Sequence, residues 1–277
     1  MELQQYIKQF QGQGLGVVAI TYDSEAILAD FSKRQGITYP LLSDPKSQAI
    51  RAYGILNTQV PADHYWYGIP YPGTYLVDRN GVVRSKYFED KYQDRFSAPT
   101  ILLREFGSRA GTRETVVNTD HLEMKYFSTR DLAHPSLRIT LVADIDLKPK
   151  MHVYAPGVSG YIPIQLQLND SPYLTPQPAA YPKSQKLYLA PIQETVAVYQ
   201  GKFRITQDIT LEDSDPMRLI LDGNRELKIT GRLRYQACDD KICYLPQNIP
   251  IEFVLKVEPL DRVRPPEPIR TPGGPAR

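Results

Sequence analysis

The sequence predicts an α/β domain followed by an all-β domain, in a chain of 277 residues that is long enough for two domains. Helical and strand patterns alternate through residues 1–107. A short polar and charged stretch at 108–114 then breaks the pattern and is the expected linker. Alternating apolar and polar residues recur through 115–258 with no convincing helix among them, which favours an antiparallel β-sandwich.

The composition is that of a globular protein, with 42% hydrophobic and 23% charged residues. A net charge of +2 gives no indication of a nucleic-acid partner. No apolar run approaches the ~18 residues that a membrane span needs, so no membrane segment is expected. Met1 is followed by polar residues that begin a helix, so no signal peptide is expected. The tail at 259–277 is rich in Pro, Gly and Arg and is expected to be disordered.

The expected elements of the first domain follow from apolar spacing and from turn residues. Leu3, Tyr6, Ile7 and Phe10 fall at helical spacing and predict an amphipathic helix. The continuous apolar run 15–20 predicts a strand that is buried on both faces. The remaining expected elements are a helix capped by Asp23 or Ser24, an extended segment at 39–43, a helix that starts at Asp44-Pro45, a hairpin of 74–77 and 82–88 around Asn80-Gly81, and a helix at 98–106.

The second domain is expected to consist of strands that are punctuated by Pro, Gly and Asn. Period-two alternation marks the clearest of them, because successive side chains of a strand point to opposite faces. These segments are 137–141, 164–168, 203–206, 227–230 and 251–255.

The two cysteines of the chain, Cys238 and Cys243, are separated by four residues near the end of the second domain. The pair can be a redox-active disulfide, a local staple, two buried thiols or half of a metal site. Closing so short a loop stabilises a fold by only about 2 kcal/mol, against about 4.7 kcal/mol for a hundred-residue loop, which favours the redox pair. A closed zinc site needs four ligands, and the four histidines are scattered, so no metal and no cofactor are expected.

The residues around the pair have plausible supporting roles. Disulfide exchange needs an exposed and partly ionised sulfur, since the thiolate is the attacking species. Lys241 lies between the cysteines and favours a thiolate, whereas Asp239 and Asp240 oppose it. Tyr235 and Tyr244 flank the pair and either shield it from oxidants or are ordinary strand aromatics.

The first domain resembles the AhpC/TSA group of peroxiredoxin-type thioredoxin folds over nearly all of 1–107. The resemblance implies a thioredoxin-like fold in which Pro72 occupies the position of the cis-proline beside the active site; a turn proline before a strand is the alternative. The residues that carry the resemblance are Glu2-Leu3-Gln4, Val17-Val18-Ala19-Ile20-Thr21-Tyr22-Asp23-Ser24, Ile37-Thr38-Tyr39-Pro40-Leu41-Leu42-Ser43-Asp44 and Tyr71-Pro72-Gly73-Thr74-Tyr75-Leu76-Val77-Asp78.

This first domain departs from the family pattern in its cysteine. In the family the reactive cysteine lies at the start of the helix that here begins at Met1, and this sequence has no cysteine before Cys238. The strand that leads into that helix is also missing, so a truncated thioredoxin-like domain is expected. Either the chain is part of a longer protein or the domain has lost its chemistry, and no peroxidase activity is expected of this chain alone. Because that strand would lie between 15–20 and 74–78, we expect loose packing there or another segment in its place.

The second domain resembles the N-terminal periplasmic domain of the DsbD thiol:disulfide interchange family, over about 115–258. The resemblance rests on Tyr235-Gln236-Ala237-Cys238, Cys243-Tyr244 and Pro246, with weaker support from His152-Val153-Tyr154 and Tyr161-Ile162-Pro163. It implies an immunoglobulin-like sandwich, an extracytoplasmic location and a thioredoxin-like redox partner. It also implies that Cys243 forms the mixed disulfide and that Cys238 resolves it.

The favoured function is therefore an electron relay by thiol–disulfide exchange through Cys238 and Cys243. One alternative is a protein-binding module without enzymatic activity. The other is a fragment of a peroxiredoxin-like antioxidant protein whose active cysteine lies upstream of Met1.

Overall fold

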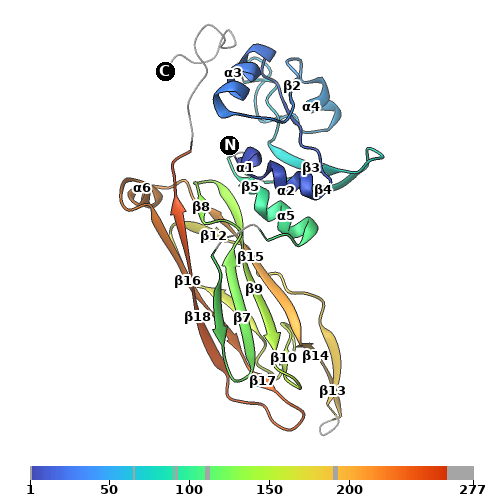
Figure 1. Cartoon of the computed structure of the whole chain (residues 1–277), viewed down its shortest axis with the longest axis vertical. Coiled ribbons are helices and arrows are strands. Elements are labelled where there is room, and N and C mark those ends of the chain that lie inside the picture. The colour runs from blue at the N-terminus through green and yellow to red at the C-terminus, as the bar shows by residue number, and fades with distance from the viewer. Residues whose placement is uncertain are drawn as a thin grey trace. The chain divides into compact units, whose positions relative to one another are not determined.

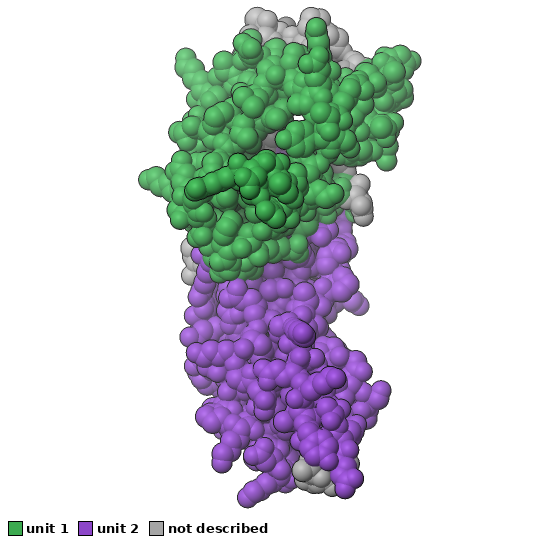
Figure 2. Space-filling view, turned by 90° about the vertical axis from the view of Figure 1, so that its right-hand side faces the viewer, with its two compact units in different colours: residues 1–108, 261–277 green, residues 109–260 purple. Residues whose placement is uncertain are grey.

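The computed structural model divides into two compact units, residues 1–108 and 109–260 (Figure 2). The division falls at the start of the stretch that was expected to be a linker, of which 110–112 lie outside the described residues, as does the tail from 261 onwards. The structure describes residues 2–64, 66–89, 91, 93–109, 113–189 and 193–260.

Unit 1 alternates short helices and strands, as the sequence pattern predicts (Figure 1). The Asn80-Gly81 turn joins two strands in antiparallel register, and Ser24 caps a helix by accepting a hydrogen bond from the Ile27 amide at 3.4 Å. The elements are α1 (Glu2–Gln5), α2 (Ile7–Gly12), β1 (Ala19–Thr21), α3 (Glu25–Gln35), β2 (Leu41–Ser43), α4 (Gln48–Ala52), β3 (Gly73–Val77), β4 (Val83–Phe88), β5 (Arg95–Phe96) and α5 (Ala98–Phe106).

Four of the described strands of unit 1 form two separate pairs. β1 pairs with β2 in parallel, and β3 pairs with β4, but no ladder joins β1 to β3. The expected discontinuity between 15–20 and 74–78 is therefore present. The expectation of a strand buried over 15–20 is wrong: β1 has three residues, and the side chains of Val18 and Ile20 are 55% and 42% exposed. A strand without a neighbour on one side has less apolar surface to pack against.

Two further expectations for unit 1 are corrected. The helix predicted from Asp44-Pro45 begins later, as α4, because Asp44 caps it from outside by accepting hydrogen bonds from the amides of Gln48 (2.8 Å) and Ile50 (3.0 Å). The peptide bond before Pro72 is trans, since none of the described peptide bonds is cis. The predicted cis-proline is therefore wrong, and Pro72 is a proline at the entry to β3.

Unit 2 is an antiparallel β-sandwich, and the predicted fold class, α/β followed by all-β, is confirmed (Figure 1). One layer has the strand order β12-β15-β9-β7-β6 and the other β11-β16-β18-β8, in which only the short β8 runs parallel to its neighbour. The strands of the two layers are β6 (Thr115–Asn118), β7 (Leu122–Ser128), β8 (Leu132–Ala133), β9 (Leu137–Leu147), β11 (Gln165–Leu168), β12 (Leu174–Pro176), β15 (Lys202–Leu211), β16 (Glu226–Tyr235) and β18 (Gln247–Val257).

The core of unit 2 lies between these layers. Ile139 and Leu141 of β9 face Leu233 of β16 and Leu255 of β18, and all four side chains are fully buried in one cluster. The buried positions of β18 alternate with more accessible ones, which is the period-two pattern that predicted the strand.

One helix of the second domain was missed. α6 (Asp215–Asp222) starts after Ser214 and carries a proline in its first turn. Met217 is fully buried in the core, and Ile220 and Leu221 pack against it at helical spacing. The expectation of an uninterrupted series of strands is wrong because this single apolar face is enough to hold eight residues as a helix against the sandwich.

A third sheet of four strands holds the cysteine pair. Its order is β13-β14-β10-β17, and Figure 1 shows it at the end of unit 2 opposite α6. The strands are β10 (His152–Tyr154), β13 (Gln185–Leu189), β14 (Glu194–Gln200) and β17 (Ala237–Cys238).

Candidate redox site

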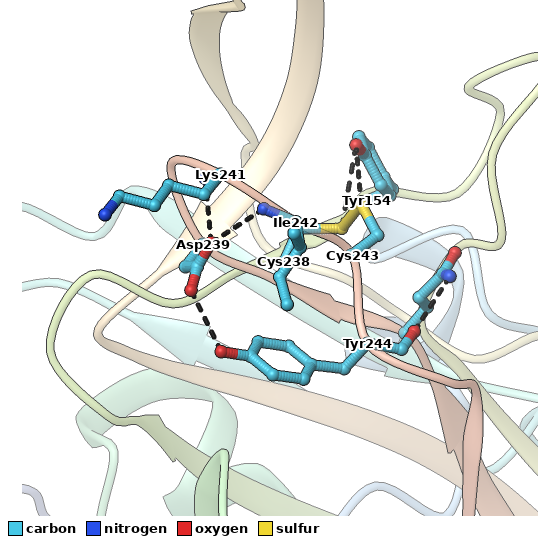
Figure 3. The surroundings of a disulfide bond; sticks show 8 residues. Tyr154, Cys238, Asp239, Lys241, Ile242, Cys243 and Tyr244 are labelled. Atoms are coloured by element: carbon cyan, nitrogen blue, oxygen red, sulfur yellow. Dashed lines mark hydrogen bonds between the residues drawn. A yellow bond between two sulfur atoms is a disulfide. The ribbon is translucent and has the colours of Figure 1, made fainter.

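Cys238 and Cys243 form a disulfide across a tight hairpin (Figure 3). The amide of Asp239 donates to the Ile242 carbonyl at 3.0 Å, and the amide of Tyr244 donates to the Ala237 carbonyl at 2.9 Å. The two cysteines thus form a non-hydrogen-bonded pair, in which the side chains of directly opposed residues lie closest in an antiparallel ladder. Their Cα atoms are 4.0 Å apart and their sulfurs are bonded.

Asp239 builds the turn of this hairpin. One carboxylate oxygen accepts hydrogen bonds from the amides of Lys241 and Ile242, both at 2.8 Å, and the other accepts from the Tyr244 hydroxyl at 2.9 Å. The amides of Ile242 and Lys241, followed by the Tyr244 hydroxyl, hold the pKa of Asp239 below its usual range. The hydrogen bond to Asp239 in turn raises the pKa of Tyr244. The turn is therefore fixed by contacts that do not depend on the sulfur–sulfur bond.

The two sulfurs differ in their surroundings. Cys238 is 1% exposed and packs with Tyr154, Val196 and Val198 in a cluster separate from the main core. Cys243 is exposed. Its neighbour Ile242 is 56% exposed, and Leu245 two residues further on is 86% exposed, so two exposed apolar side chains flank Cys243.

Tyr154 is the side chain that meets both sulfurs. Its hydroxyl lies 3.7 Å from Sγ of Cys238 and 3.7 Å from Sγ of Cys243, and it is the donor, since disulfide sulfurs carry no proton (Figure 3). Burial raises the pKa of Tyr154, so the hydroxyl keeps its proton at neutral pH. The sequence placed Tyr154 only within a family pattern, and its contact with the sulfurs was not anticipated.

Tyr161 packs against Tyr154. The two rings stack with centroids 4.1 Å apart, and the Tyr161 hydroxyl donates to the Glu194 carboxylate at 2.7 Å. This hydrogen bond raises the pKa of Tyr161 to about 12. Tyr161 thus packs against the apolar cluster that contains Tyr154 and Cys238.

The residues that were predicted to support the pair lie elsewhere. Tyr235 is fully buried in the main core, where its hydroxyl donates to Gln247 at 2.6 Å, so it does not cover the disulfide. The Tyr244 ring contacts the tilted ring of His121, with centroids 4.5 Å apart, and its hydroxyl donates to Asp239. The Lys241 side chain extends away from the sulfurs (Figure 3), and Pro72 belongs to unit 1.

Two negative findings concern the described residues only. No three His, Cys, Asp or Glu side chains gather there in a way that would hold a metal ion. Across the same part of the chain, no helix has the length and apolar character to cross a membrane.

Comparison with family models confirms both resemblances. Residues 1–86 match the model described as the AhpC/TSA family. Residues 127–254 match the model described as thiol:disulfide interchange protein DsbD, N-terminal. The second match includes both cysteines and Tyr154, whereas the first contains no cysteine.

Similarity to individual proteins is partial. Alkyl hydroperoxide reductase E of Mycobacterium bovis is 31% identical over 85 residues, which are 30% of this chain and 51% of that protein. Thiol-disulfide oxidoreductase ResA of Geobacillus thermodenitrificans is 29% identical over 76 residues, 27% of this chain and 36% of that protein. The chain thus spans about half the length of these relatives, or less. The N-terminal periplasmic domain of ScsB from Proteus mirabilis superimposes with a TM-score of 0.37 at 14% identity, covering 54% of this chain and 52% of that chain. The family matches together support a thiol-based redox function.

Proposed function

We propose that this protein exchanges electrons with a thioredoxin-like partner through the Cys238–Cys243 disulfide. The observation that carries the proposal is the asymmetry of the pair: Cys243 is exposed between two exposed apolar side chains, whereas Cys238 is 1% exposed beside the Tyr154 hydroxyl. Attack by a large partner requires one accessible sulfur, and the second sulfur then remains shielded as the leaving group.

The exchange begins when a partner thiolate attacks Sγ of Cys243. A bond forms between the two sulfurs, the Cys238–Cys243 bond breaks, and its electron pair moves to Sγ of Cys238 as a thiolate. A second partner thiolate then attacks the partner's sulfur in the mixed disulfide, so that the partner leaves oxidised and Cys243 leaves as a thiolate. Two electrons have entered the sandwich, and the reverse sequence releases them.

Tyr154 is suited to stabilise the charge that develops on Cys238. The Cys238 sulfur is almost fully buried, so an anion there lacks water. The Tyr154 hydroxyl already lies 3.7 Å from this sulfur and has a proton to donate. Its hydrogen bond strengthens as the sulfur becomes negative, because bonds to a charged acceptor exceed neutral ones.

The hairpin geometry favours re-formation of the disulfide. The backbone hydrogen bonds of the hairpin and the Asp239 turn do not involve sulfur. The reduced thiols therefore stay opposed, which gives a high effective concentration of one sulfur for the other. A pair that closes readily after a partner leaves suits a relay.

The exposed side chains of Ile242 and Leu245 supply apolar docking area next to Cys243. A partner whose own active cysteine lies in an apolar surface complements them. Disulfide exchange of this kind belongs to oxidising compartments, and we propose an extracytoplasmic, periplasmic location.

The redox potential of the pair tests the proposal against a structural staple. Thiols are counted with and without reductant, and the potential is then measured by equilibration with glutathione and dithiothreitol buffers. A relay predicts a potential above about -300 mV. A potential well below this value identifies a structural bridge and contradicts the proposal.

A further inference from the structure

His152 lies directly across the sheet from Cys238. The two residues are register partners in the antiparallel pairing of β10 with β17, and Val153 pairs with Ala237 beside them. Directly opposed residues share a face of the sheet, with Cβ atoms about 5 Å apart. Val153 and Ala237 belong to the main core, so His152, Tyr154 and Cys238 occupy the opposite face.

The His152 ring is buried but has no hydrogen-bond partner in the described part of the chain. The residue is 2% exposed, and neither Nδ1 nor Nε2 is paired. Its ring meets that of Tyr154 edge-on, with centroids 5.6 Å apart. A buried polar group without a partner costs stability, and in native structures such groups often have a catalytic or redox role.

The charged groups that face His152 come from the hairpin. Asp240 and then Asp239 favour its protonated form, whereas burial, the larger effect, lowers its pKa below the usual value for histidine. On its other side, β14 places the neutral Gln200 opposite it. The imidazole is thus neutral at physiological pH and has a nitrogen lone pair free to take a proton, with two carboxylates near enough to stabilise the cation.

We propose that His152 accepts the proton of the Cys238 thiol when this sulfur resolves the mixed disulfide. The inference rests on the proposed exchange function. As the proton passes from Cys238 to the imidazole, Sγ of Cys238 attacks Sγ of Cys243, the new disulfide bond forms, and the partner sulfur departs with the electron pair of the broken bond. The imidazolium then returns its proton to the departing thiolate or to solvent. In the opposite direction the imidazole takes a proton from the attacking partner thiol or from solvent and passes it to the Cys238 thiolate as this sulfur leaves.

A chemical probe isolates this step without any protein partner. The reduced full-length chain reacts with 5,5′-dithiobis(2-nitrobenzoate), which releases one coloured thiolate when Cys243 attacks and a second when Cys238 resolves the mixed disulfide. In His152→Gln we expect the second release to slow by about 100-fold at neutral pH, because acid–base catalysis contributes about 10²–10⁴-fold. The rate of this second release should also lose the pH dependence that the protonation of His152 causes in the wild type. The first release should be unchanged, which also reports an intact site.

His121 provides the matched control. It is 7% exposed, its ring contacts that of Tyr244, and its Nδ1 is also unpaired. Unlike His152, it is not a register partner of Cys238. His121→Gln should therefore leave both releases unchanged. An unchanged second release in His152→Gln, or an equal slowing in both variants, overturns the proposal.

A second measurement does not depend on the folding of a histidine variant. NMR titration of the reduced wild-type protein gives the pKa of each imidazole, and the same titration is made in Cys238→Ala. We expect the pKa of His152 to be lower in the reduced wild type than in Cys238→Ala, because the Cys238 thiol is protonated where histidine titrates and its S–H donates to the neutral imidazole. The pKa of His121 should be the same in both proteins. Equal values for His152 overturn the proposal. Neither test uses a thioredoxin-like partner, so a failure here is distinguishable from a failure of the exchange function.

Discussion

Units 1 and 2 each match a family of redox proteins, but they differ in two physical respects. In unit 1 the strands β1 to β4 form two separate pairs and Ile20 of β1 is exposed, whereas unit 2 closes two sheets over a continuous core. Residues 1–86 contain no cysteine, whereas unit 2 contains both. A match to a family's fold therefore does not carry its chemistry, which depends on the presence and the surroundings of particular side chains.

The largest expected effect concerns the closed core of unit 2. Leu255→Ala removes a fully buried side chain, and we expect a loss of about 2–5 kcal/mol in the free energy of unfolding, measured in urea. Leu219 of the same unit is 76% exposed, and Leu219→Ala should change stability by less than about 0.5 kcal/mol. Equal losses in the two variants would contradict the assignment of the core.

The next effect concerns the thiolate that forms at Cys238. Tyr154→Phe removes the hydroxyl that lies 3.7 Å from both sulfurs. We expect reduction of the disulfide by a thioredoxin to slow by about tenfold, which corresponds to about 1.4 kcal/mol in the barrier. Tyr161→Phe is the control, because it keeps the ring stack on Tyr154 and removes the hydrogen bond to Glu194. The disulfide of this variant should be reduced at nearly the wild-type rate. Stopped-flow tryptophan fluorescence of the thioredoxin follows both variants, and identical rates would rule out the role of Tyr154.

A smaller effect concerns the turn that holds the hairpin. The pKa of Asp239 is lowered in the folded protein by hydrogen bonds from the amides of Ile242 and Lys241 and from the Tyr244 hydroxyl. A carboxyl group with a lowered folded pKa contributes stability that is fully present above its unfolded value, about 4, and is lost as pH falls through the folded value. Protection of the amides of Lys241 and Ile242 against hydrogen exchange, taken relative to the intrinsic exchange rate at each pH, should therefore fall only below about pH 4.

Asp240 supplies the control for this prediction. Asp239→Ala should accelerate exchange at both amides at neutral pH as well, since the acceptor is then missing at every pH. Asp240→Ala should not do so. Rapid exchange in both variants would show that the turn does not depend on the Asp239 carboxylate.

The smallest effect is expected in unit 1. Val18 is 55% exposed before β1, so Val18→Ser removes little buried surface and should change the free energy of unfolding by less than about 0.5 kcal/mol. Chemical denaturation measures this change, with Ile50→Ala in the same unit as the comparison, because Ile50 is 2% exposed. A large loss in Val18→Ser would indicate that β1 is covered in solution.

Elements with local signals were predicted well from the sequence. The Asn80-Gly81 hairpin and the helix α5 lie where expected, because turn chemistry and capping depend on adjacent residues. The shortness of β1 was not predicted, because burial of a strand depends on neighbours that its own residues do not specify. The spacing of Met217, Ile220 and Leu221 would have revealed α6 had so short a helix been considered.

The cysteine pair of the site was predicted, but most of its surroundings were not. Spacing alone indicated that Cys238 and Cys243 can meet. Tyr154 lies 84 residues before Cys238 in the sequence, and only the pairing of β10 with β17 brings it to the sulfurs. Tyr235 is an ordinary strand aromatic, the alternative that the sequence left open, and the sequence could not decide this because the face that it occupies is set by the register of β16.

Capture of a thioredoxin-like partner tests the central claim most directly. A thioredoxin whose second active-site cysteine is replaced by serine, and whose first carries 2-nitro-5-thiobenzoate in a mixed disulfide, is incubated with the reduced Cys238→Ser and Cys243→Ser variants. The remaining thiol of each variant displaces the coloured thiolate, and covalent complexes are counted by mass spectrometry. The account predicts a mixed disulfide at Cys243 in the first variant and little or none at the buried Cys238 in the second. Equal trapping at both positions, or none at Cys243, would contradict it.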